Sequence, residues 1–193
     1  MNKRNLTALS VAIGLAMSAS AMGAGISEAQ YKSEGQRIAA RHTNEQVSCE
    51  SMAGNSKDVC QAEANGRESV AKAELEASYQ DSSKNRYEVG MARANAAYAV
   101  ANEKCDDAAG NVQDVCRKEA QSAEVAAKAD AERILKTVDA KAGQQDATTE
   151  ADQKAETEKR NAAYAVAKEK CDALGEKAQA TCIAEAKARH GQS

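Results

Sequence analysis

The chain has 193 residues, a formal net charge of −3 and no Phe, Trp or Pro. Its acidic and basic residues are interspersed, which argues against a nucleic-acid groove or an anionic membrane surface as the main partner, because both attract clustered Lys and Arg. Large aliphatic residues are few, whereas alanine, the best helix former, is abundant and no proline interrupts a helix. Composition therefore predicts an all-α protein with thin tertiary packing.

The first 21 residues have the features of a secretory signal peptide. Two basic residues precede a short apolar run over 6–17, and the small-residue motif A-S-A follows at 19–21. The run is too short to cross a bilayer core of about 30 Å. We expect residues 1–21 to be removed, which changes the net charge from −3 to −5. No second apolar run follows, so we expect no membrane span after cleavage and a periplasmic or secreted location.

The rest of the chain consists of three related repeats. The six cysteines form pairs whose members are 11 positions apart: Cys49 and Cys60, Cys105 and Cys116, and Cys171 and Cys182. The flanking sequence also recurs, since 95–106 and 161–172 differ at one position only. We divide the mature chain into repeats 22–82, 83–146 and 147–193. The pattern predicts six helices, over 27–53, 56–80, 83–109, 112–142, 147–174 and 177–189.

The spacing of each cysteine pair predicts a helical hairpin. On an unbroken helix, residues 11 apart would be separated by about 16.5 Å, whereas a disulfide needs Cα atoms within about 7 Å. Gly110 suits the left-handed residue that ends a helix, and Asn111 suits the N-cap of the next one. Gly54 and Asn55 repeat this arrangement, whereas the third repeat lacks it. The cysteines are symmetric about these turns, which predicts the disulfides 49–60, 105–116 and 171–182.

The second repeat carries two apolar stripes, of which the first has heptad spacing, alternating four and three residues. The first stripe consists of Tyr87, Met91, Ala94, Tyr98, Ala101 and Cys105. The second consists of Cys116, Ala120, Ala123, Ala127, Ala131, Ile134, Val138 and Ala142. We expect the bulky stripe to pack on the alanine stripe within the hairpin. The sequence leaves open whether the three hairpins extend as an array or fold into a loose bundle.

The cysteines have two other interpretations, a metal site and a redox centre. Both sites typically use a C-x-x-C motif, which the sequence lacks. The two histidines, His42 and His190, are far apart in the sequence and lie outside any cluster. An even number of cysteines in an exported chain is typical of disulfides. We therefore expect six disulfide-bonded cysteines, no metal site and no cofactor.

Common catalytic motifs are also missing from the sequence. It contains no G-x-S-x-G, no H-E-x-x-H and no glycine-rich phosphate loop. Its carboxylates lie beside basic residues on helix faces, as Glu68 and Lys72 do at i,i+4. We propose no catalytic residue and expect that the protein is not an enzyme.

The repeat unit resembles that of a known group of proteins. Its motifs are the helix from Tyr98 to Asp106, the Gly110-Asn111 turn, the return Asp114 to Cys116 and the continuation Lys72 to Ala77. The same units occur in exported, alanine-rich, cysteine-pair repeat proteins of proteobacteria, some of which are labelled TolA-like cell-envelope proteins. The resemblance covers most of the mature chain and implies a place in the cell envelope. The function of TolA itself is not carried over, because we expect neither its membrane anchor nor its globular C-terminal domain here.

These observations lead to two functional hypotheses. The first is a non-enzymatic, periplasmic structural or protein-interaction module of the cell envelope, whose partner is an envelope protein and not a nucleic acid. Heptad stripes are also compatible with self-association. The alternative is a periplasmic ligand- or metal-sequestering stress protein, which the acidic, cysteine-containing repeats suggest.

Overall fold

A computed structural model describes residues 25–140 and 145–192, and in this part of the chain it contains six α-helices and one short 3-10 helix. They are α1 (Glu28–Glu50), α2 (Asn55–Tyr79), α3 (Ser83–Lys104), η1 (Cys105–Asp107), α4 (Asn111–Asp139), α5 (Gln145–Cys171) and α6 (Glu176–His190). The helices pack antiparallel, and each of the three disulfides joins two adjacent helices. The predicted fold class is therefore confirmed. The expected signal peptide and Ala142 lie outside the described residues.

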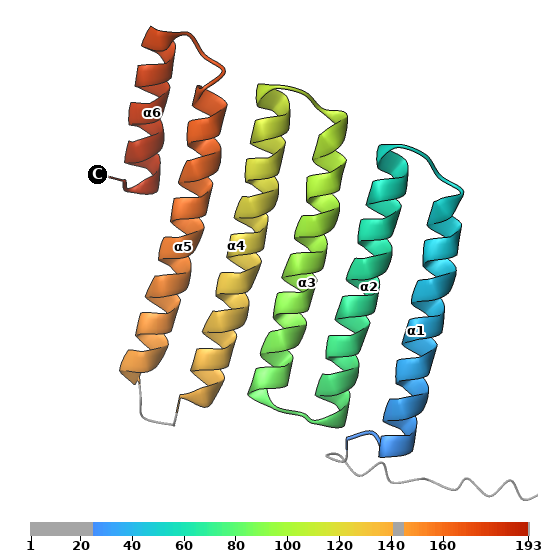
Figure 1. Cartoon of the computed structure of the whole chain (residues 1–193). Coiled ribbons are helices and arrows are strands. Elements are labelled where there is room, and N and C mark those ends of the chain that lie inside the picture. Colours follow the sequence, from blue (N-terminus) through green and yellow to red (C-terminus); the bar gives the residue numbers. More distant parts are fainter. Residues whose placement is uncertain (1–24, 141–144, 193) are drawn as a thin grey trace, which may run out of the picture.

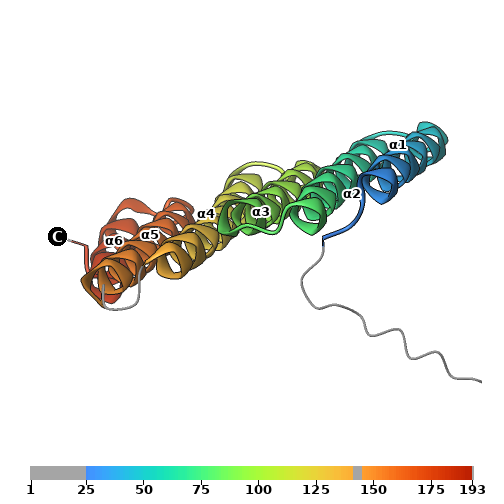
Figure 2. The same ribbon diagram turned by 90° about the horizontal axis from the view of Figure 1, so that it is seen from below.

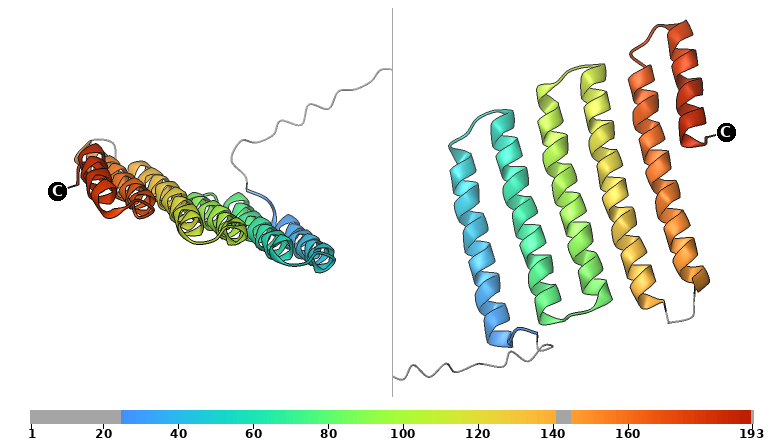
Figure 3. Two further views of the ribbon diagram at one scale, coloured as in Figure 1. Left: turned by 90° about the horizontal axis from the view of Figure 1, so that it is seen from above. Right: turned by 180° about the vertical axis from the view of Figure 1, so that it is seen from behind.

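The six helices form a single layer (Figure 1). Among the described residues, extensive contacts join only elements that are neighbours along the chain, and viewed from below or above the helices stand in one row (Figures 2 and 3). The chain is thus an extended array and not a bundle. Each inner helix packs against two neighbours, whereas α1 and α6 each have one. Below, the contact between two adjacent helices is called a seam.

Serine caps begin the first helix of each of the first two hairpins. Ser27 accepts a hydrogen bond from the Gln30 backbone N–H at 3.3 Å, while the Ser27 N–H donates to Gln30 Oε1 at 2.9 Å. This reciprocal pair is a capping box, which satisfies two otherwise unpaired donors at the helix start. Ser82 caps α3 in the same position by accepting from the Asn85 N–H at 3.0 Å.

The turns differ from the predicted ones in the role of glycine. Gly54 and Gly110 have φ of 57° and 60° but ψ of −152° and −146°, and each is the N-cap of the following helix. The prediction that they end the preceding helix in the left-handed conformation is wrong. Asn55 and Asn111 are correspondingly the first helical residues rather than N-caps. The first helix of each hairpin therefore ends three to five residues earlier than predicted, directly beside its cysteine.

The buried side chains are mostly alanines. In the described part of the chain, Ile38 and Leu75 are the large aliphatic residues that are buried, together with three cysteines and eight alanines. Small residues allow the helix axes to approach closely: a Cβ added to Gly66 of α2 would lie 2.9 Å from the Cβ of Ala96 in α3. The array is held by close helix–helix contact rather than by bulky interlocking side chains.

The predicted alanine stripe of α4 is only partly buried. Ala120 and Ala131 are buried as expected, but Ile134 and Val138 are 51% and 54% exposed. The prediction assumed one apolar face, whereas α4 packs on both sides. Ala131 faces α3, where its Cβ lies 2.8 Å from the position of a Cβ on Gly90. Ala129 is buried near α5, in a crevice that residues of both helices line.

Candidate functional site

All six cysteines lie where the sequence analysis placed them. The Cα–Cα distances are 5.6 Å for Cys49–Cys60, 5.6 Å for Cys105–Cys116 and 5.7 Å for Cys171–Cys182. The first cysteine of each pair is at most 1% exposed, so the bond is sheltered on the side of the first helix. The third hairpin forms the same bond although its N-cap, Gly175, has an ordinary φ of −66°. The cysteines close the hairpins and leave no thiol for other chemistry.

A polar contact accompanies each disulfide at the same repeat position. The acidic residue that follows the first cysteine contacts the side chain three positions before the second. The distances are 2.7 Å for Glu50–Lys57, 3.4 Å for Asp106–Gln113 and 2.8 Å for Asp172–Gln179. Lys57 lowers the pKa of Glu50 through this hydrogen bond and through its charge. Each turn is therefore closed twice, once by the disulfide and once by this polar side-chain contact.

The two seams between hairpins, α2–α3 and α4–α5, repeat the same pair of ion pairs. Lys104–Glu63 at 3.6 Å corresponds to Lys170–Glu119 at 2.6 Å, and Arg93–Glu74 at 2.6 Å corresponds to Lys159–Asp130 at 2.6 Å. The alignment of the cysteines places the partners at equal distances from their turns. The first hairpin therefore joins the second, and the second joins the third, in the same register.

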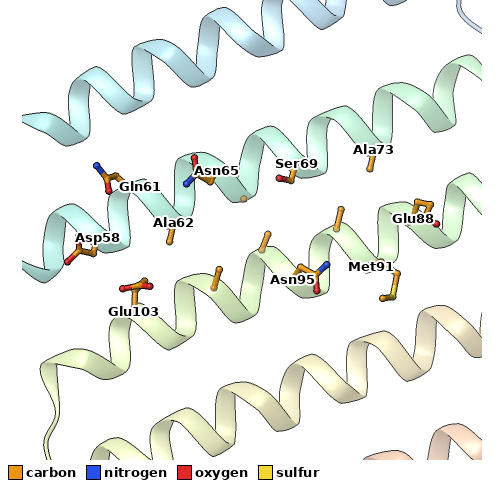
Figure 4. A pocket seen from close by; sticks show the side chains of 14 residues that line it. Asp58, Gln61, Ala62, Asn65, Ser69, Ala73, Glu88, Met91, Asn95 and Glu103 are labelled. Atoms are coloured by element: carbon orange, nitrogen blue, oxygen red, sulfur yellow. The ribbon is translucent and has the colours of Figure 1, made fainter.

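A groove of about 690 Å³ runs along one face of the α2–α3 seam (Figure 4). Asp58 and Glu103 stand at one end and Glu88 and Met91 at the other, and amide side chains such as Asn65 lie between them. None of the three carboxylates forms an ion pair with a described residue. We call this the acidic groove, because no basic side chain lines it.

A second groove, of about 620 Å³, lies along the α2–α3 seam and shares Gly66 and Ala96 with the acidic groove. Its floor is apolar, with Val70 and Val100, and its charged residues include both signs. The acids in this second groove have partners: Glu63 contacts Arg67 and Lys104, and Glu74 contacts Arg93. The unpaired negative charge therefore belongs to the acidic groove.

His42 lies on α1 and His190 is the last residue of α6, which are the two edge helices of the array (Figure 1). His42 of α1 contacts Asn65 Oδ1 at 2.8 Å and Glu68 Oε2 at 3.4 Å. The hydrogen bond from Lys72 and the charge of His42 lower the pKa of Glu68. His190 packs its ring 6.4 Å from that of Tyr164. Over the described ranges there is no cluster of three or more His, Cys, Asp or Glu that could hold a metal ion.

The acidic groove was not foreseen from the sequence. The sequence places Met91 in a stripe expected to pack within the hairpin, whereas Met91 lines the groove beside α2. The groove arises because α2 of one repeat packs on α3 of the next, and no local motif encodes that contact. The available signal was the helical spacing of polar residues on both helices, which becomes informative only once the seam is known.

No helix in the described residues is both long and apolar enough to cross a membrane. Three disulfides are consistent with an oxidising compartment outside the cytoplasm. Comparison with known proteins adds no assignment: no model of a protein family, no curated protein and no solved structure matches this chain.

Proposed function

We propose that this chain is a non-enzymatic structural or protein-interaction module of the cell envelope that works in the periplasm. The supporting observation is a single layer of disulfide-closed hairpins whose two faces are both open. Such a layer offers a large docking surface for its length, as in other repeat architectures whose units contact only their neighbours. The signal-peptide features of the sequence and its three disulfides are in keeping with a periplasmic location.

The acidic groove is the docking site that we propose for a partner protein. Its unpaired carboxylates favour a partner segment with basic side chains, because opposite charges steer association and select partners. Glu88 and Glu103 are separated by 15 positions on α3, which corresponds to about 22 Å along a helix. An extended segment of about seven residues spans that length. The partner would therefore present lysine or arginine near both ends of such a segment.

Site-specific photo-crosslinking in the periplasm tests this proposal with a matched control. A crosslinking residue replaces Ala99, which lines the acidic groove, or Ala165, which has the same local sequence in the third repeat. The proposal predicts a crosslinked envelope protein from position 99 alone, joined through a basic segment. The crosslink should weaken in the variant with both Glu88→Gln and Glu103→Gln, because the groove then loses two of its three unpaired charges. Equal crosslinking at both positions, or none at either, would contradict the proposal.

The alternative is a periplasmic ligand- or metal-sequestering stress protein, which the acidic, cysteine-containing repeats suggest. Any ligand would have to bind carboxylates that are spread apart, since Glu88 and Glu103 stand at opposite ends of the acidic groove. The cysteines cannot contribute thiolate ligands while they remain in disulfides. Calorimetric titration of the oxidised protein with zinc and with calcium separates the two functions. Stoichiometric binding that is lost on Glu88→Gln would favour sequestration, and absence of heat would favour the interaction module.

A further inference from the structure

The two edges of the array expose helix faces that resemble the faces packed inside it. The side of α1 opposite buried Ile38 carries six exposed, uncharged residues at helical spacing: Ala29, Ser33, Gln36, Ala40, Thr43 and Val47. The side of α6 opposite buried Ala186 carries exposed Lys177, Thr181, Ala184 and Ala188. In a chain with 28% charged residues, these two stripes together carry one charged residue, Lys177, whereas the ends of a repeat array are ordinarily polar.

The chain already shows how such faces pack, because it builds the same seam twice. Alignment on the cysteines makes Gly66 and Ala96 of the α2–α3 seam equivalent to Ser122 and Ala162 of the α4–α5 seam. The corresponding contact between two copies of the chain would join α6 of one copy to α1 of the other. Its equivalent residues are Ala188 and Ala40. Both are exposed alanines, which are small enough for the same close approach. The orientation also agrees, since α1 and α6 run antiparallel like the helices of the two existing seams.

The charged positions of the seam are partly present on these edges. Glu185 occupies the position of Glu63 and Glu119, is exposed, and has no ion-pair partner among the described residues. The residue that would face it is Ser48, which stands where α3 and α5 have lysines. An α6–α1 contact would therefore keep the alanine packing but lack this ion pair, and it would be weaker than the internal seams.

We propose that a second copy of this chain docks on these edges, with α6 of one copy packed against α1 of the next in the register of the α2–α3 and α4–α5 seams. The contact is heterologous, because two different surfaces meet, so it leaves a free edge at each end. Association therefore continues the single layer from copy to copy and does not close into a symmetric dimer. This inference is independent of the proposed partner in the acidic groove.

Sedimentation velocity of the oxidised protein over a range of concentrations tests the inference. The wild type should associate progressively with concentration, without a limiting dimer. Ala40→Glu blocks the α1 edge and Ala188→Glu blocks the α6 edge, so each variant alone should remain monomeric. An equimolar mixture has one intact edge of each kind and should form a one-to-one dimer and nothing larger. Ala127→Glu, which adds the same charge at an exposed position of α4, should behave as the wild type.

A gain-of-contact variant makes the test independent of disrupted folding. Ser48→Lys supplies the lysine that faces Glu185 in the proposed register, and it should tighten association by about two- to five-fold. Adding Glu185→Gln to the same chain should cancel that gain. The inference is overturned if wild type and Ser48→Lys both stay monomeric at every concentration. Oligomers that persist in Ala40→Glu or Ala188→Glu would also overturn it, because they would use another surface.

Discussion

At the scale of single residues, the turns depend on two glycines in a backbone region that side chains avoid. Gly54 and Gly110 combine positive φ with ψ near −150°, a region that is essentially restricted to glycine. No neighbouring atom within 4 Å would meet an added Cβ at either residue, so the restriction comes from the backbone and not from packing. Gly175 occupies the N-cap of the third hairpin without this constraint.

Replacing these glycines by alanine should therefore have unequal effects. Gly110→Ala should destabilise the protein by about 1–3 kcal/mol, because alanine is strained at that φ and ψ. Gly175→Ala keeps an accessible backbone and should have a clearly smaller effect. Urea unfolding followed by circular dichroism measures both variants. Equal losses would mean that the positive φ does not define the turn.

Acid should weaken the α4–α5 seam in part through Glu132, which contacts Lys154 across it. Hydrogen bonds from Lys136 and Lys154 hold the pKa of Glu132 below its usual value. A carboxylate with a lowered pKa in the folded state contributes stability above its unfolded pKa, and this contribution is lost as the pH falls through the folded pKa. Glu132→Gln should therefore show a smaller drop in melting temperature between about pH 7 and about pH 3 than the wild type. An unchanged drop in melting temperature would show that solvent screens the contacts of Glu132 with the two lysines.

At the scale of helices, seams made of small residues hold the array together. Gly66 lies opposite Ala96 so closely that an added methyl group would overlap, and Gly90 lies opposite Ala131 in the same way. Glycine inside a helix is unfavourable by itself. At these positions it lowers helix propensity but allows the two helices to approach closely. By contrast, Gly35 of α1 has its nearest contact, from Leu75, at 3.8 Å.

Alanine substitutions separate these two effects. Gly35→Ala should stabilise the protein by about 0.5–1 kcal/mol, because the site has room for a methyl group and alanine favours the helix. Gly66→Ala gains the same propensity but must separate α2 from α3, and it should be destabilising by about 1–3 kcal/mol. Adding Ala96→Gly removes the opposing methyl group and should restore part of the loss. Thermal unfolding of the three variants measures this, and a stabilised Gly66→Ala protein would contradict the close seam.

At the scale of the whole molecule, stability is distributed along one dimension. Each helix depends on its chain neighbours, and α6 depends on α5 alone. Each disulfide closes a short loop, a contribution of about 2–3 kcal/mol in the chain-entropy model. The free energy of unfolding of a small domain is usually about 5–15 kcal/mol, so each disulfide supplies a large share of it. The thin core of this chain could supply little.

Removing disulfides from different hairpins should therefore give different kinds of unfolding. The double variant Cys171→Ala, Cys182→Ala should increase hydrogen exchange in α6 while leaving α1 to α4 protected, because α6 then has only its seam with α5. The double variant Cys105→Ala, Cys116→Ala loosens the middle of the array and should lower global stability by about 2–3 kcal/mol. Exchange measured by mass spectrometry resolves the helices. Uniform loss of protection in the first variant would show that the array unfolds as one unit.

The hairpins could be predicted from the sequence, but their arrangement could not. The pairing of Cys105 with Cys116 depends on residues within one turn, and the spacing and the glycine were sufficient to predict it. The contact of Gly66 with Ala96 joins different repeats, and alanine is so common in this chain that it does not identify a particular seam. The single stripe predicted for α4 failed for the same reason, since nothing in its sequence indicated a neighbour on each side.

The connectivity of the disulfides also has a consequence for how the protein matures. Each bond joins cysteines that are consecutive along the chain, first 49 with 60, then 105 with 116, then 171 with 182. When such a chain enters an oxidising compartment N-terminus first, the native bonds form if each pair of cysteines joins before the next cysteine emerges. Slow disulfide reshuffling, which takes seconds to hours, is then unnecessary. The hairpins would then be completed in the order in which they stand in the array.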